Sequence, residues 1–322
     1  MNKKDFALLL LILVVGTAVA LLNPRFLSAI NLANTANLVG LFGIFAIGQA
    51  FVIITGGIEL SVGSSIALLG VLFVDLIANM GLSWPFALLL MLIAGMVIGL
   101  VHGLLITRLG LQPFIITLCG LLIYRGVARF YTADATAGFG FGQSFPVLEM
   151  ITVGRFWGVP VSFIAMLLIA AVMWVVLHHS VFGRHLFAVG RNEEAARYSG
   201  IPTRRVIVCA YMICGLLTAV SAIFFAMYTR SISPSSHGNF YELYAIAAAV
   251  LGGFSLRGGE GSVIGVVLGA MLLQVLQNLV NLLGIPSSLN FAVTGSVILI
   301  GVIADNRFNS YRGRRLGRRS AG

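Results

Sequence analysis

The 322-residue sequence has few charged residues: Asp, Glu, Lys and Arg together make up only 9% of the chain. About a quarter of a typical soluble domain is charged, so this scarcity excludes a sizeable soluble domain. Hydrophobic residues make up 59% of the chain, and the mean hydropathy is +1.03. The composition therefore predicts an all-α polytopic membrane protein, with residues 1–322 forming one transmembrane domain.

Lysine is nearly absent, since Lys3 and Lys4 are the only two. A nucleotide-binding phosphate loop needs a lysine after its glycines, so the chain cannot drive a process with that ATP chemistry. The zinc-protease and serine-hydrolase motifs are also missing. We therefore expect no catalytic residues, no bound cofactor and no metal site in this chain. Any energy that the protein uses must come from an ion gradient or from another subunit.

Cysteine is scarce as well. Cys119, Cys209 and Cys214 all fall in apolar stretches, whereas disulfide or metal sites use paired cysteines in polar loops. We expect three small buried side chains.

About ten apolar stretches are long enough to cross a bilayer. They cover residues 6–22, 31–54, 60–80, 85–107, 113–130, 159–177, 206–228, 240–251, 262–283 and 289–304. For the first stretch a cleaved signal peptide is the alternative, because Ala18-Val19-Ala20 resembles a cleavage site.

The basic residues predict the orientation. With the N-terminus inside and the spans alternating, fifteen Lys and Arg residues fall inside and five outside, as the positive-inside rule demands. Both termini are then cytoplasmic. The basic tail, residues 305–322, is expected to contact anionic lipid of the bilayer, with no nucleic-acid partner.

The charged loop at residues 178–205 falls on the cytoplasmic side and contains a short predicted helix. Asn192 is a suitable N-cap, the acidic pair after it suits the helix dipole, and glycine followed by proline ends the helix. Its small side chains favour docking into a groove on a cytoplasmic partner, although a simple interfacial linker is the alternative. The residues assigned to this helix are Asn192, Glu193, Glu194, Ala195, Ala196, Arg197, Ser199 and Gly200.

Two glycine-centred segments, residues 56–63 and 252–261, resemble each other, and each leads into an apolar helix. They predict interrupted helices and an internal repeat, features common in transporters. A weaker pair, residues 109–113 and 283–286, falls on opposite sides in the expected topology.

An acidic side chain between long apolar runs is costly unless it faces protein, water or a substrate. Glu59 is such a residue. The alternative role of Glu59 is to cap a helix. The alternative role of the nearby asparagine and glutamine side chains is to form hydrogen bonds between helices. His102 is expected to be a packing histidine with its hydrogen bonds satisfied. Candidate pathway or gate residues are Asn34, Asn37, Gln49, Gly56, Gly57, Glu59, Ser61, Gly252 and Gly253.

Four segments together resemble the ribose-type ABC sugar permeases: residues 183–201, 55–64, 113–118 and 251–262. The chain departs from the family at Glu59, where aspartate is usual, and at His102, where asparagine is usual. The resemblance implies a permease subunit of a bacterial inner-membrane importer for a monosaccharide or polyol. It also implies a second permease subunit, a periplasmic sugar-binding protein, and an ATPase that binds ATP and magnesium and contacts the 192–200 helix.

Two alternatives remain open at this point. One is a related ABC permease for branched-chain amino acids or nucleosides, and the other is an ion-coupled carrier that needs no ATPase.

Overall fold

The computed structural model describes residues 3–140, 142–286, 289, 292, 295, 296 and 299. Most of the expected last span and the whole basic tail, residues 305–322, lie outside the described residues.

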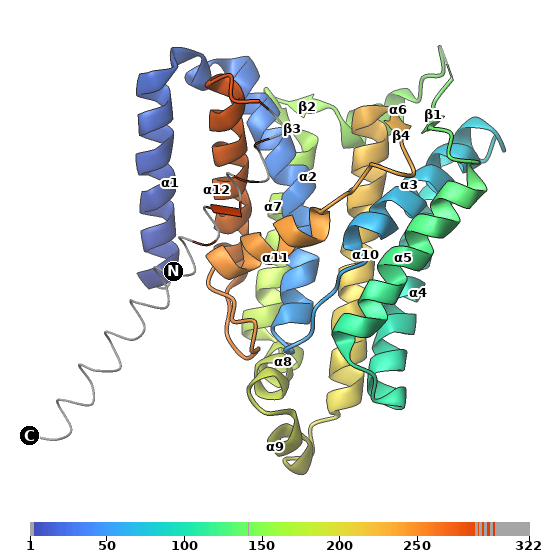
Figure 1. Cartoon of the computed structure of the whole chain (residues 1–322), viewed down its shortest axis with the longest axis vertical. Helices are drawn as coiled ribbons and strands as arrows, with labels where there is room; N and C mark the ends of the chain where they lie inside the picture. The colour runs from blue at the N-terminus through green and yellow to red at the C-terminus, as the bar shows by residue number, and fades with distance from the viewer. Residues whose placement is uncertain are drawn as a thin grey trace, which may run out of the picture.

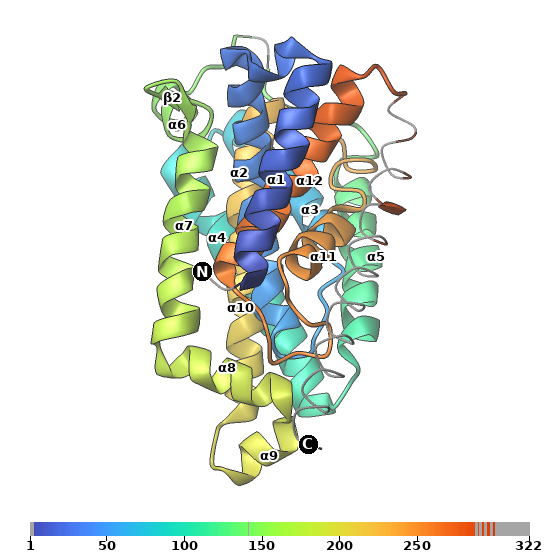
Figure 2. The same ribbon diagram turned by 90° about the vertical axis from the view of Figure 1, so that its left-hand side faces the viewer.

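The described chain is almost entirely helical (Figures 1 and 2). Its first half contains α1 (Lys3–Leu22), the 3₁₀ helix η1 (Pro24–Leu27), α2 (Ala29–Ile53), α3 (Val62–Ala78), α4 (Trp84–Leu109), α5 (Pro113–Tyr131), β1 (Ala137–Gly138), α6 (Pro146–Thr152), β2 (Arg155–Phe156) and β3 (Val159–Pro160). Its second half contains α7 (Val161–His179), α8 (Val181–Arg191), α9 (Glu193–Tyr198), α10 (Thr203–Thr229), β4 (Ser231–Ile232), α11 (Tyr241–Leu251) and α12 (Val263–Leu282).

Seven helices of the described chain are long and apolar enough to cross a membrane: α1, α2, α4, α5, α7, α10 and α12. The expected count of about ten is not confirmed, because α3 and α11 have only 17 and 11 residues. Both helices begin inside the bundle, where an irregular segment replaces part of a span (Figure 1).

The two glycine segments are the places where helices are interrupted, as the sequence predicts. The first break, residues 54–61, separates α2 from α3, with Gly56 in the left-handed region at φ +80°. The second break, residues 252–262, separates α11 from α12, with Gly253 at φ +86°. Both breaks lie toward the end that carries α8 and α9, whereas the ends of α4 and α12, which bear the weaker pair, lie at opposite ends (Figure 1).

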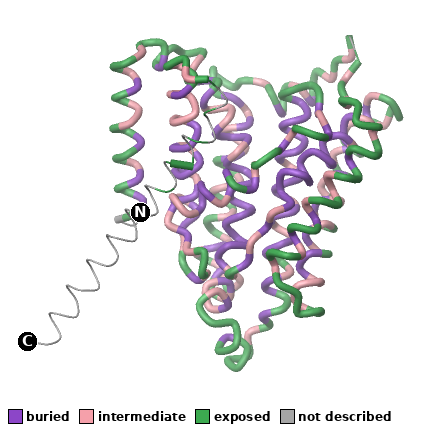
Figure 3. Tube along the Cα trace, in the orientation of Figure 1, coloured by how far each residue is buried: buried purple, intermediate pink, exposed green. Residues whose placement is uncertain are grey.

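The core is built around α10, which packs against α2, α3 and α4. Glycines let α4 and α10 approach backbone to backbone: a Cβ added to Gly99 would lie 2.1 Å from the Tyr211 carbonyl oxygen, and one added to Gly95 would lie 2.4 Å from that of Gly215. The outer helices α1, α5 and α7 instead expose many large apolar side chains, as a lipid-facing surface requires. Figure 3 shows the exposed residues along α1 and α5. The expectation of three buried cysteines is wrong for Cys119 and Cys209, which are exposed on their helices.

Arg230 connects α10 to α6 and to the loop before α6, at the end of the molecule that carries the short strands. Its guanidinium donates from Nη1 to Glu149 Oε1 (2.8 Å) and from Nη2 to the Gln143 carbonyl oxygen (2.5 Å). The hydrogen bond from Arg230 holds the pKa of Glu149 below its ordinary value. This pair therefore adds stability above the unfolded pKa of about 4.3, and that stability is lost as the pH falls through the lower folded pKa.

The acid dependence of this pair can be measured. As the pH falls below about 4, the thermal unfolding midpoint of the wild type should fall more steeply than that of Glu149→Gln, which has no carboxylate to protonate. The difference should be small because the ion pair is partly exposed to solvent. Parallel curves for the two proteins would contradict the assignment.

Candidate functional site

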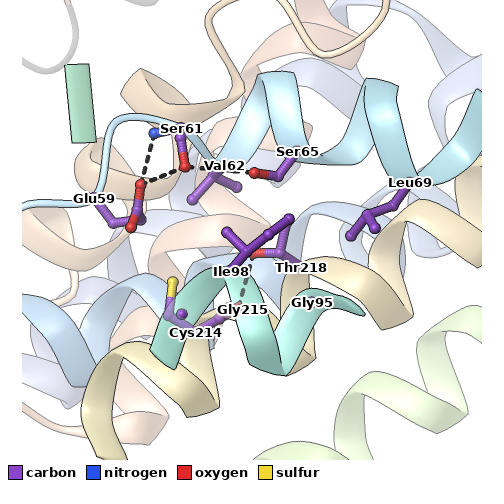
Figure 4. Close-up of a pocket in the computed structure, with 11 residues that line it drawn as sticks. Glu59, Ser61, Val62, Ser65, Leu69, Gly95, Ile98, Cys214, Gly215 and Thr218 are labelled. Carbon is purple, nitrogen blue, oxygen red and sulfur yellow. Dashed lines mark hydrogen bonds between the residues drawn. The ribbon is translucent and has the colours of Figure 1, made fainter. Parts of the chain in front are cut away.

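Glu59 lies in the first break and is only 5% exposed. Its Oε1 accepts hydrogen bonds from the backbone N–H and the hydroxyl of Ser61, both at 2.7 Å (Figure 4). The carboxylate thus occupies the N-terminal end of α3, where free N–H groups and the helix dipole favour negative charge. The helix-capping alternative therefore describes part of what Glu59 does.

The other carboxylate oxygen belongs to a buried chain of hydrogen bonds. Glu59 Oε2 lies 2.6 Å from His102 Nδ1 on α4, and His102 Nε2 lies 2.9 Å from the Tyr124 hydroxyl on α5. His102 is 2% exposed, so the expectation of a satisfied buried histidine is confirmed. The three side chains connect the first break to two membrane-spanning helices.

The backbone of the first break is also held by side chains of α2, α5 and α10. With its amide oriented to donate to the Glu59 carbonyl oxygen (3.1 Å), Gln49 also accepts from the Glu59 N–H (3.2 Å). The Ile58 carbonyl oxygen accepts from the hydroxyls of Thr117 (3.2 Å) and Tyr211 (3.3 Å). Irregular backbone at membrane depth needs such partners because lipid supplies none.

A small cavity of about 10 Å³ lies beside Glu59, which is space for about one water molecule. Its walls come from α3, α4 and α10 and are mostly apolar (Figure 4). In this conformation the space next to Glu59 is therefore too small for a solute.

The structure brings together only part of the predicted pathway set. Gly56, Gly57, Glu59 and Ser61 lie in the first break, and Gln49 contacts its backbone. Asn37, in contrast, lies twelve residues before Gln49 on α2, which is about 18 Å along the helix. Asn37 accepts from the Ser162 hydroxyl (2.6 Å), as the interhelical alternative expects. Asn34 is exposed on the same helix, with Arg155 Nη2 at 3.5 Å from its Oδ1.

Gly252 and Gly253 lie in the second break and line a larger cavity of about 440 Å³. A Cβ added to Gly252 would lie 2.4 Å from the Gly265 backbone, so the break folds closely onto the start of α12. Charged side chains of α1, α8 and the break also line this cavity: Lys4, Asp5, Arg191 and Glu260.

The two breaks meet each other and α8 at one place, which we call the glycine junction (Ile54–Gly56, Gly190 and Gly258–Gly259). The Gly259 N–H donates to the Ile54 carbonyl oxygen (2.8 Å). A Cβ added to Gly190 would lie 1.8 Å from the Ile54 carbonyl oxygen and 2.4 Å from the Gly259 nitrogen. The C-terminal turn of α8 is therefore in direct backbone contact with both breaks.

The predicted 192–200 helix is present as α9 (Glu193–Tyr198). Asn192 is its N-cap and accepts from the Ala195 N–H (2.9 Å), and Gly200 follows it at φ +83°. Only Ala196 is buried, and the remaining residues of α9 are exposed at the end of the molecule (Figure 2). Glu193 and Arg197 are one helical turn apart, but they are not among the ion pairs of the described residues. The Arg197 guanidinium instead lies 5.9 Å from the Tyr198 ring centroid.

No candidate site residue was predicted in the segment between β4 and α11, which falls between two of the expected spans. The structure places Gly238 of this segment against Gly63 at the start of α3. Arg125 Nη1 on α5 donates to the carbonyl oxygens of Pro234 (2.8 Å) and His237 (2.7 Å). Two sequence features could have indicated this contact: Arg125 lies inside a predicted span, and Gly238 lies late in a polar stretch.

In the described part of the chain, seven apolar helices, two interrupted helices that meet at a junction, and an exposed helix beside that junction are typical of a multi-pass membrane transport protein. The comparisons with known proteins agree with this class. The chain belongs to the family described as "Branched-chain amino acid transport system / permease component", whose model matches residues 31–302. This confirms the family resemblance and makes the chain a multi-pass inner-membrane permease.

Several relatives match along nearly their whole length. The ribose import permease protein RbsC of Bacillus subtilis (strain 168) is 41% identical, covering 95% of this chain and 94% of the relative. RbsC of Escherichia coli (strain K12) is 37% identical with the same coverage. The autoinducer 2 import system permease protein LsrD of Photorhabdus laumondii is 32% identical, covering 93% and 90%. Among solved structures, none matches the chain significantly.

Proposed function

We propose that this chain is the membrane-spanning permease subunit of an ATP-driven importer for a monosaccharide or related polyol. The names of the RbsC relatives support the substrate class. The observation that carries the proposal is the glycine junction, because it connects the exposed α9 region to both interrupted helices. The proposed partners of the chain are a second permease subunit, a periplasmic sugar-binding protein and an ATPase that binds ATP and magnesium. Both termini of the chain are proposed to be cytoplasmic.

In this mechanism the ATPase moves α9, and the chain itself forms no covalent bond with the solute. Asn192 ends α8 and caps α9, so a displacement of α9 is passed directly to the last turn of α8. Gly190 in that turn contacts Ile54 and Gly259. The movement thus reaches the backbone that leads to Glu59 and the start of α3.

The coupling role of α9 can be tested with proline. Proline fixes φ near −65°, so Gly200→Pro is incompatible with the left-handed conformation at the end of α9. In liposomes containing the full transporter, we expect ATP-driven uptake and the stimulation of ATPase activity by the binding protein to be lost, with membrane insertion unchanged.

Gly81→Pro is the matched control. Gly81 is also left-handed, at φ +66°, and has open space around its Cβ position, but it follows α3 instead of α9. It should retain coupling. If Gly200→Pro stays fully coupled, or if both variants lose coupling equally, α9 is not the contact.

The description of the family favours a second candidate, a permease for branched-chain amino acids. Uptake assays with ribose and with leucine, each using the binding protein encoded beside this chain, distinguish the two. Concentrative uptake by this chain alone, abolished by an uncoupler, would instead show an ion-coupled carrier.

A further inference from the structure

The segment between β4 and α11 is non-helical, yet it does not stay at the outer end of the molecule. It descends from β4 to the start of α11, which lies near the middle of the bundle (Figure 1). A Cβ added to Gly63 would lie 1.9 Å from the Gly238 carbonyl oxygen, and one added to Gly238 would lie 2.2 Å from that of Gly63. The segment is therefore pressed against the first turn of α3.

The contacts of the segment indicate its depth in the helix bundle. Gly63 is fifteen residues from the C-terminal end of α3, which corresponds to about 22 Å of helix. That end of α3 is level with the end of α5, because the Tyr131 hydroxyl donates to Asp75. The hydrocarbon core of a bilayer is about 30 Å thick, so Gly238 lies well below the membrane surface.

Arg125 provides a second measure of depth. It lies six residues before the end of α5, which is about 9 Å along the helix. Its guanidinium donates to the carbonyl oxygens of Pro234 and His237, and so partners backbone groups that lipid would leave without hydrogen bonds.

The segment nevertheless exposes polar side chains. Ser235, Ser236 and Asn239 are exposed in the described structure. Their neutral groups form a continuous network: Ser236 Oγ donates to Ser233 Oγ (2.9 Å), Ser235 Oγ lies 3.2 Å from Ser233 Oγ, and Asn239 Nδ2 donates to the Ser235 carbonyl oxygen (3.3 Å). We call residues 233–239 the hydroxyl strip.

Irregular backbone with exposed polar groups cannot face hydrocarbon, and it is tolerated in membranes only against protein or a water-filled space. The exposed groups of the strip are hydroxyls and an amide, which both donate and accept hydrogen bonds. This is the surface that an uncharged polyhydroxyl solute needs when it leaves water. An ionic solute would instead require exposed charge.

From this placement we propose that the hydroxyl strip lines the water-filled route by which a neutral polyhydroxyl solute crosses the membrane. The proposal rests on the proposed function for its solute, and on the depth of the strip for its location. The main solute contacts are then assigned to residues 233–239 instead of the predicted set around Gln49 and Glu59. The Glu59 region then holds the start of α3 in place beside the route.

Thiol labelling tests the location independently of transport. In a background with the exposed cysteines removed (Cys119→Ala and Cys209→Ala), Ser235→Cys and Asn239→Cys would be treated with a membrane-impermeant charged maleimide. The control is Val172→Cys, at an exposed apolar position on α7. Because the thiolate is the reactive form and needs water, the strip positions should react on the order of tenfold faster than the control.

Uptake of ribose by the complete transporter tests the role. The maleimide should block uptake in the Ser235→Cys protein and leave the Val172→Cys protein active. Labelling of the strip no faster than the control would overturn the proposal, including the case in which a second copy packs directly over it. Fast labelling without loss of uptake would also overturn it. If the unlabelled wild type transports no sugar, the proposed function fails, whereas the labelling contrast still decides whether the strip faces water.

Discussion

Replacing Glu59 with alanine is expected to lower the free energy of unfolding by about 3 kcal/mol or more, because three buried hydrogen-bond partners each lose their acceptor at a cost of about 1–3 kcal/mol. The substitution leaves His102 Nδ1 without its partner at 2.6 Å. It also leaves the N–H and hydroxyl of Ser61 without their acceptor at the start of α3. These groups are buried, so water cannot replace the lost hydrogen bonds at low cost.

Glu59→Gln is the matched variant for this experiment. Its amide oxygen can still accept from Ser61, and its nitrogen can donate to a His102 tautomer that carries its proton on Nε2. We therefore expect a loss of only about 1 kcal/mol, the value of an ordinary hydrogen bond. Thermal unfolding in detergent would measure both variants. Equal losses would show that the negative charge, rather than the hydrogen-bond geometry, holds the break.

Replacing Gly190 with alanine is the second substitution with a large expected effect. In a helix interior this change normally stabilises by up to about 1 kcal/mol, because glycine is a poor helix former. Here the added methyl group would lie 1.8 Å from the Ile54 carbonyl oxygen and 2.4 Å from the Gly259 nitrogen. Both are backbone atoms, so neither can move aside as a flexible side chain would.

Overpacking of this kind costs about 1–3 kcal/mol, which exceeds the gain in helix propensity. We therefore expect Gly190→Ala to be less stable than the wild type and to lose ATP-driven uptake, since it forces α8 away from both breaks. Gly126→Ala on α5 is the control: nothing lies within 4 Å of its Cβ position, so it should be neutral or slightly stabilising. Full uptake by Gly190→Ala would show that the glycine junction does not transmit the movement.

Much of this architecture could be predicted from local sequence signals. The N-cap at Asn192 and the glycine at position 200 define α9, and the glycine-rich segments mark both helix breaks. These features depend on neighbouring residues, because capping and left-handed turns are set by local backbone chemistry. The position of an acidic residue between apolar runs likewise identified Glu59 as a residue that needs partners.

The remaining features depend on tertiary contacts. The expected number of full spans is not confirmed, because α3 and α11 are apolar but shorter than the spanning helices and begin inside the bundle. The amides of Asn34 and Asn37 suggested a polar route, but their position on α2 places them far from Glu59. The depth of the hydroxyl strip follows from contacts with Gly63 and Arg125, which are more than a hundred residues earlier in the chain.

The backbone contact between α4 and α10 restricts how such a protein can change shape. Helices that interlock through Gly95, Gly99 and Gly215 cannot slide or separate without losing their closest packing. They should therefore rotate together as one rigid unit during the transport cycle. An inward-facing opening would then have to form along a different seam, between this paired unit and the shorter helices α3 and α11.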